Sequence, residues 1–252
     1  MSLIPPDWLA PPRALRLGAK EVHVWLVNLD VPPDALASYQ KLLSEDERDR
    51  AARFHFELHR NQFIYCRGLL RQKIAQYLKL DPAKLVFSYN KYGKPFFGLE
   101  SHGAAFKFNL AHSHGFALLA FSLHAEIGVD LEKHRPDYAT DEIAERFFAP
   151  EEVAVLKSIP SDSRSAAFFD CWTRKEAFLK AHGRGLGLGL DNFIVEFAPG
   201  RNAALLKTRF GPDDEALRWA MHALPMPPNF SAALVVEGEA RPMKLWRDEV
   251  KS

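Results

Sequence analysis

The chain has 252 residues, of which 47% are hydrophobic and 26% are charged, with 33 Lys and Arg against 32 Asp and Glu. This length allows one large domain or two modest ones, and the near-neutral charge excludes a global attraction to nucleic acid or to an anionic membrane. The two cysteines lack CxxC spacing, and neither a signal-peptide pattern nor an apolar run of about 18 residues occurs, so a cytoplasmic protein without membrane contact is expected.

The first half of the chain predicts an arm, a strand, two helices and then four more strands. Four prolines between residues 5 and 12 predict an extended arm over residues 1–20. Ser44 followed by Glu47 is typical of a capping box, so a helix is expected to begin there. Apolar periodicity and turn residues predict the other elements: a strand at 22–29, a helix at about 58–79, and strands at 85–89, 106–110, 116–123 and 127–131.

The second half is similar in plan to the first. Helical segments come first, at about 140–157 and 163–182. Strand-like segments follow at 193–198, 204–210, 216–224 and 230–236. Helices followed by strands predict the α+β class, and the recurring order predicts two similar lobes in a pseudo-twofold arrangement. The expected division is an arm at 1–20, an N-terminal lobe at 21–124 and a C-terminal lobe at 125–252.

The segment GVDLEKHRP, residues 128–136, places two carboxylates on one face of a strand. Asp130 and Glu132 are two positions apart, so their side chains point to the same side. Such a pair repels itself unless a proton, a lysine or a cation intervenes, and its oxygens favour Mg²⁺, with Mn²⁺ as a second choice. A solvated face of an edge strand is the alternative, and a mixed zinc site from His112, His114 and Asp130 is another.

The segment CWTRKEAFLKAHGRGL, residues 171–186, predicts a helix that ends in glycines. Helical periodicity puts Lys175, Glu176 and Lys180 on or near one stripe. The alternative is an ordinary surface ion pair between Glu176 and Lys180, worth about 0.3 to 0.5 kcal/mol. The glycines predict a helix C-cap and a loop that a ligand can approach closely, and they lack the GK[ST] ending of a P-loop.

These two segments, about 40 residues apart, together resemble the signature motifs of the Sfp-type 4'-phosphopantetheinyl transferases. YGKP at 92–95 and FNLAHS at 108–113 resemble the family's upstream coenzyme A contacts, and RDRAARF followed by RGLLR resembles its N-terminal basic helices. The resemblance implies the fold of two α+β lobes with the active site between them. It implies an enzyme, a holo-[acyl-carrier-protein] synthase, that moves 4'-phosphopantetheine from coenzyme A to a serine hydroxyl of an apo-carrier protein and releases adenosine 3',5'-bisphosphate.

The resemblance also implies roles for the residues of the two motifs. Asp130, Glu132 and Glu176 match the family's acidic ligands of Mg²⁺. Glu176 is the first choice for the general base that takes the serine proton, with Glu132 or a metal-bound water as the alternatives. Lys180 matches the lysine that contacts the pyrophosphate, and Lys175 is expected to orient the acidic residues or to pair with them.

The phosphates of coenzyme A are expected to meet residues upstream of these motifs. His112 matches the histidine that the family uses near the phosphates, and Arg50 and Arg53 match its basic coenzyme A contacts. Seven Lys or Arg and two acidic residues lie between positions 48 and 73, which favours an anion site, although a solvated basic helix face is the alternative. The remaining expected contacts lie in the YGKP turn: Tyr92, Gly93, Lys94 and Pro95.

The partner that the resemblance implies is an apo-carrier protein, acyl or peptidyl, in a groove between the lobes. Phe147 and Phe148, in the segment 146–156, are expected either to contact the carrier or to belong to the core. A monomer is expected, because two lobes in one chain complete the site. The rival hypotheses are a catalytically silent module that binds coenzyme A or a carrier, and a metal-dependent phosphohydrolase. The intact acidic trio argues against the silent module, and the physiological carrier and its pathway are left open.

Overall fold

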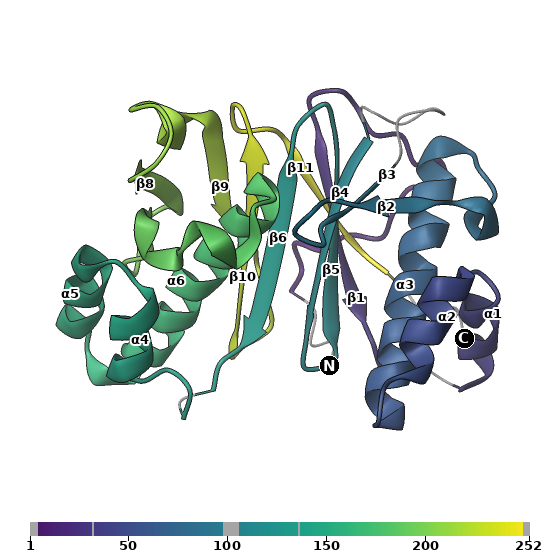
Figure 1. Cartoon of the computed structure of the whole chain (residues 1–252), viewed down its shortest axis with the longest axis horizontal. Coiled ribbons are helices and arrows are strands. Elements are labelled where there is room, and N and C mark those ends of the chain that lie inside the picture. Colours follow the sequence, from purple (N-terminus) through teal and green to yellow (C-terminus); the bar gives the residue numbers. More distant parts are fainter. Residues whose placement is uncertain (1–4, 32, 98–105, 136, 249–252) are drawn as a thin grey trace.

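The computed structural model describes residues 5–31, 33–97, 106–135 and 137–248, and within these it forms four β-sheets with helices on the outside (Figure 1). The strands and helices follow one another in this order: β1 (Val22–Asn28), α1 (Pro33–Gln40), α2 (Glu45–Ala52), α3 (Glu57–Leu78), β2 (Phe87–Tyr89), β3 (Pro95–Phe97), β4 (Phe106–Ser113), β5 (Phe116–Leu123), β6 (Ile127–Lys133), α4 (Asp141–Phe147), α5 (Pro150–Ser158), α6 (Ser161–His182), β7 (Phe193–Glu196), β8 (Ala204–Thr208), β9 (Trp219–Ala223), β10 (Phe230–Glu237) and β11 (Met243–Arg247).

The two larger sheets lie face to face in the middle of the molecule, and each carries a long helix on its outer side (Figure 1). The first sheet has the strand order β11-β1-β5-β4, and the second has the order β6-β10-β9. The 22-residue helix α3 packs on the first sheet, and the 22-residue helix α6 packs on the second. This arrangement confirms the predicted α+β class.

Alternation along the strands explains the layers. In β1, Val24 and Leu26 join the core between the two sheets, whereas Trp25 and Val27 join the core beneath α3. Because β1 is buried on both faces, its sequence is an almost continuous apolar run. In the part of the chain that the structure describes, none of the helices has the length and apolar character that a membrane crossing needs.

The last strand, β11, belongs to the first sheet although it follows the second in sequence. It runs parallel to β1, with Met243 opposite Val22, and Leu9 of the N-terminal arm forms a bridge to Trp246. The chain segment expected to form the C-terminal lobe therefore contributes its final strand to the sheet of the N-terminal lobe. The division at residues 20 and 124 as domain boundaries stays a prediction.

Two predicted elements differ in detail from the observed ones. The segment 140–157, expected as one helix, forms α4 and α5, which are separated before Pro150. Proline has no backbone N–H and its ring disfavours a helical preceding residue, so it begins a new helix instead of continuing the old one. The segment 216–224 starts as part of a 3₁₀ helix, Glu215–Arg218, before β9 begins.

Candidate active site

Strand β6 and helix α6 bring the acidic residues of the two sequence motifs to one cavity. Asp130 and Glu132 on β6 and Glu176 and Lys180 on α6 all line the same cavity of about 340 Å³. The predicted alternation on the strand is therefore observed, and so is the predicted shared face of Glu176 and Lys180. The carboxylates come from β6 and α6, and Leu110, Ala111 and His112 of β4 line the same cavity.

A glycine permits this close approach of strand and helix. A Cβ atom added at Gly128 of β6 would lie 2.1 Å from the carbonyl oxygen of Ala177 and 2.3 Å from the amide nitrogen of Ala181. Both are backbone atoms of α6 and cannot move aside without shifting the helix. Any other residue at position 128 would push α6 away from the β6 carboxylates.

Asp130 is the buried member of the acidic trio. Lys180 Nζ donates to Asp130 Oδ1 at 2.6 Å, whereas Asp130 Oδ2 is buried without a hydrogen-bond partner. Burial raises the pKa of Asp130 to about 6, and the neighbouring Lys180 limits the rise. A desolvated carboxylate oxygen without a donor is stabilised strongly by a cation, so Asp130 Oδ2 suits a metal ligand.

The other two carboxylates are partly buried and differ in their partners. Ser113 Oγ donates to Glu132 Oε2 at 2.8 Å, which orients this carboxylate. Burial, with a smaller contribution from the charge of Asp130, raises the pKa of Glu176. A raised pKa makes a carboxylate a better proton acceptor near neutral pH. The contact of Ser113 with Glu132 was not predicted, because the sequence spacing of these residues does not show that the end of β4 lies beside β6.

The trio fits a hard divalent cation by its chemistry. Its donors are carboxylate oxygens, which Mg²⁺ prefers, and Asp130 Oδ2 is available to a ligand. Among the described residues, no three His, Cys, Asp or Glu side chains converge as a ready-made metal site. Binding an ion therefore requires the carboxylates to turn toward a common point. The same finding leaves the zinc alternative from His112, His114 and Asp130 without support.

Two further cavities adjoin the acidic one. A cavity of about 260 Å³ is lined by Tyr92, Gly93, Lys94 and Pro95 together with Leu110, Glu176 and Lys180, and it shares the last three residues with the acidic cavity. The second, of about 220 Å³, is lined by Arg50 and His112 among other residues, and it shares His112 with the acidic cavity. Leu110 lines all three. The three cavities thus form one continuous site along β4.

Arg50 and His112 are basic residues that line the cavity of about 220 Å³. The side chain of His112 reaches solvent along one side, but partial burial, followed by the charges of Lys180 and Arg50, lowers its pKa. The positive charges of Lys180 and Arg50 disfavour protonation of His112. A bound anion would offset this repulsion and stabilise the protonated imidazole. Arg53, the C-cap residue of α2, is not among the residues that line the three cavities.

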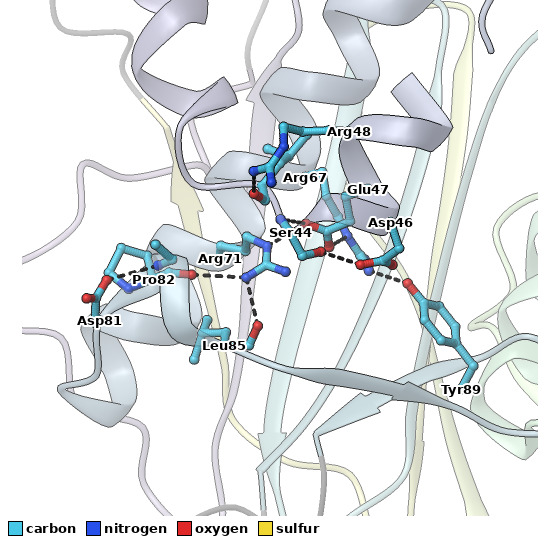
Figure 2. A network of polar contacts seen from close by, with 12 residues as sticks. Ser44, Asp46, Glu47, Arg48, Arg67, Arg71, Asp81, Pro82, Leu85 and Tyr89 are labelled. Carbon is cyan, nitrogen blue, oxygen red and sulfur yellow. Dashed lines mark hydrogen bonds and ion pairs between the residues drawn. The ribbon is translucent and has the colours of Figure 1, made fainter. Parts of the chain in front are cut away.

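Part of the basic cluster between residues 48 and 73 is structural. Arg67 and Arg71 of α3 both form ion pairs with the buried Glu47 of α2, and the Arg71 Nε to Glu47 Oε2 distance is 2.6 Å (Figure 2). The backbone N–H of Ser44 also donates to Glu47, as the predicted capping box requires. Arg67 donates further to the hydroxyl of Tyr89 at 2.7 Å. This network joins α2, which carries Arg50, to α3 and β2.

One expectation about residues near the motifs is wrong, and for Phe148 the structure decides between two stated alternatives. Lys175 does not pair with the acidic trio: it is fully buried, and its Nζ lies 2.6 Å from Glu152 Oε2 in the core of the second lobe. The pair forms there because Lys175 projects about 100° away from Glu176 around the helix. Phe148 belongs to the core, as one of its two expected roles stated, and Phe147 is only partly buried against that core.

Carboxylates, a lysine, an arginine and a histidine around one site suit the binding of a phosphorylated ligand with a divalent cation. Two family models match the chain: the 4'-phosphopantetheinyl transferase superfamily over residues 126–235, and the 4'-phosphopantetheinyl transferase N-terminal family over residues 32–124. The chain is 37% identical to the 4'-phosphopantetheinyl transferase HetI of Nostoc sp., covering 95% of this chain and 97% of that protein. It is 32% identical to the transferase Sfp of Bacillus subtilis, covering 62% of this chain and 67% of that protein.

The chain therefore belongs to the 4'-phosphopantetheinyl transferase superfamily. The predicted family and the predicted enzyme class are confirmed.

Proposed function

We propose that this enzyme transfers 4'-phosphopantetheine from coenzyme A to a serine hydroxyl of an apo-carrier protein, with Mg²⁺ as its ion. The serine oxygen bonds to the phosphorus next to pantetheine, the pyrophosphate P–O bond breaks, and adenosine 3',5'-bisphosphate leaves with the bridging oxygen. Transfer from coenzyme A to carrier proteins is the reaction of the family. The observation that carries the proposal for this chain is the continuous site that joins the acidic trio to Arg50 and His112.

The acidic trio would hold the ion, and the basic residues would hold the phosphates. Mg²⁺ bound by Asp130, Glu132 and Glu176 would offset the negative charge that builds on the pyrophosphate oxygens. Lys180, on the same cavity wall, supplies a point charge on a flexible stem, which suits a phosphate that shifts during transfer. The 3'-phosphate is assigned to the Arg50 end of the site.

Glu176 is assigned the role of general base. It lines the acidic cavity beside Asp130 and Glu132, where the serine hydroxyl would approach the ion and the diphosphate. Glu132 is the weaker choice, because it already accepts a hydrogen bond from Ser113. His112 is assigned to the phosphates, where its two ring nitrogens can donate once an anion raises its pKa.

The carrier is assigned to the surface beside the acidic cavity. Trp172 lines this cavity, and its ring lies 5.7 Å from that of Phe147 and 5.8 Å from that of Tyr138. Arg146 and Arg135 stack on these two outer rings, at 5.3 and 4.7 Å from the ring centroids. Apolar rings edged by cations complement an acidic helical partner. A monomer completes the proposal, because one chain supplies every assigned residue, and the absence of CxxC-spaced cysteines favours the cytoplasm.

Mass spectrometry of carrier proteins tests the proposed reaction. A panel of apo-carriers is incubated with the enzyme, coenzyme A and Mg²⁺, and a carrier with its acceptor serine changed to alanine serves as the control. We expect the mass of one phosphopantetheine arm to appear on an apo-carrier and not on the control. If every carrier keeps its mass while coenzyme A stays intact, the chain is a silent binding module. Hydrolysed coenzyme A without a modified carrier would point to a phosphohydrolase.

Removal of the Arg50 side chain should weaken coenzyme A binding. Arg50→Ala is expected to raise the KM for coenzyme A about 10- to 100-fold, since a hydrogen bond to a charged group contributes about 1.5 to 3 kcal/mol. The kcat should stay near the wild-type value, because the contact exists before and during transfer. Initial rates at varied coenzyme A concentration check this. Arg53→Ala should give a smaller rise, and a loss confined to kcat would contradict the role of Arg50.

A further inference from the structure

We propose that Lys94 is a positioning residue: its ammonium group holds the C-terminal end of α6, and with it Glu176 and Lys180, and does not bind the phosphates of coenzyme A. This inference rests on the proposed function, and it replaces the expected role of the Lys94 side chain. Residues 92–95 line one of the three cavities of the site, and the inference concerns the Lys94 ammonium group alone.

The contacts of the Lys94 ammonium carry the inference. Lys94 Nζ donates to the carbonyl oxygen of Ala181 at 3.0 Å and to that of Ile127 at 3.3 Å, and it forms an ion pair with Glu126 Oε2 at 2.8 Å. An ammonium group has three donor hydrogens, so these three acceptors use all of them. The side chain is 14% exposed, which leaves little room for a fourth partner.

The rest of the turn is attached to the same helix end. Asn90 Nδ2 donates to the carbonyl oxygen of Gly183, the C-cap residue of α6, at 2.8 Å. The Asn90 side-chain oxygen accepts from the backbone N–H groups of Tyr92 and Lys94, at 2.9 and 3.0 Å. Gly93 supplies the positive φ of 85° that closes the turn. Two hydrogen bonds thus tie the turn to the end of α6, one from Lys94 to Ala181 and one from Asn90 to Gly183.

A cation at the C-terminal end of α6 affects the position of the α6 side chains that line the acidic cavity. The C-terminal end of a helix carries partial negative charge on its unpaired carbonyl groups, and an ammonium group stabilises it. Glu176 and Lys180 lie in the last two turns of α6, which ends at His182. A displacement of about 1 Å in such a site can lower turnover about 100-fold. Lys94 therefore acts through α6 on the residues that face the substrate.

The electrostatic surroundings of Lys94 also disfavour a phosphate. Glu126 lies against its ammonium group and pairs as well with Lys107 at 2.6 Å, so an anion there would meet a carboxylate. Burial lowers the pKa of Lys94, and the charge of Glu126 opposes that change. Lys107 makes a matched control, because it shares Glu126 but makes no described hydrogen bond to α6.

The experiment separates positioning from phosphate binding. In Lys94→Met we expect kcat to fall about 10- to 100-fold, while the Kd of adenosine 3',5'-bisphosphate, measured by calorimetry, stays within about twofold of the wild type. Lys94→Arg keeps a cation at the helix end and should recover most of the lost turnover. Lys107→Met should match the wild type in both measurements. A large rise in Kd with unchanged kcat would make Lys94 a phosphate contact and overturn the inference.

Hydrogen exchange gives a readout that does not depend on activity. Loss of the Lys94 contacts should speed amide exchange in the last two turns of α6 in Lys94→Met, whereas Lys107→Met should leave these amides as protected as in the wild type. Unchanged exchange in Lys94→Met would overturn the inference even if the enzyme transfers phosphopantetheine. Absence of transfer by the wild type would overturn the proposed function alone.

Discussion

The Glu176→Gln enzyme should lose about 10²- to 10⁴-fold in kcat, the range that a positioned general base contributes. Glutamine has nearly the same shape, but its amide does not take up the serine proton and brings no negative charge to a cation. Because Glu176 is partly exposed at the cavity wall and forms no ion pair with another described residue, the fold should remain intact. Initial rates of carrier modification, measured by mass spectrometry at saturating coenzyme A, check this.

A matched acid-to-amide change elsewhere controls for the loss of charge. Glu142 lies in the exposed first turn of α4, outside the three cavities of the site. Glu142→Gln should keep wild-type turnover, and both variants should melt within a few degrees of the parent protein. Wild-type turnover in Glu176→Gln would remove this residue from the reaction and leave Glu132 as the next choice.

Glu47→Ala is expected to reduce the free energy of unfolding by about 3 to 5 kcal/mol, because it leaves two buried guanidinium groups without a counter-charge. Arg67 and Arg71 are 7% and 1% exposed, and both pair with the Glu47 carboxylate (Figure 2). Arg71 has almost no contact with solvent, and Arg67 meets it only where it lines one of the cavities of the site. Urea unfolding at pH 7, with slope and midpoint analysed together, measures the change.

Glu45 offers the control for this stability prediction. Glu45 lies two positions before Glu47 in the same first turn of α2, but its side chain is exposed. Glu45→Ala should therefore change the free energy of unfolding by no more than about 0.5 kcal/mol. If both variants change the free energy of unfolding by the same small amount, Arg67 and Arg71 must be solvated without Glu47. That result would contradict the network drawn in Figure 2.

Local patterns predicted the parts of the site that depend on neighbouring residues. Alternation on a strand put Asp130 and Glu132 on one face, and the spacing of Ser44 and Glu47 predicted where α2 begins; both are observed. The approach of Glu176 to this pair is a long-range contact that spacing does not reveal. It depends on Gly128, whose missing side chain lets α6 touch β6, and only the family resemblance indicated it.

Two lysines of the motifs have partners in other elements that sequence reasoning did not indicate. Lys175 and Lys94 both belong to the motifs, yet they pair with Glu152 and Glu126, which no motif includes. A basic residue in a motif indicates a charge but not the direction of its side chain, because the nearest carboxylate in space decides that. The pairing of β11 with β1 was not predicted either, because parallel strands that lie far apart in the sequence leave no local pattern.

The central claim is that three carboxylates from β6 and α6 bind one divalent ion beside the diphosphate of coenzyme A. A crystal structure of the enzyme with coenzyme A and Mg²⁺ tests this most directly. We expect a single ion whose ligands include an oxygen of Asp130, Glu132 and Glu176 at about 2.0 to 2.1 Å, together with a diphosphate oxygen. A bound coenzyme A whose diphosphate lies away from these residues, with no ion among them, would contradict the claim.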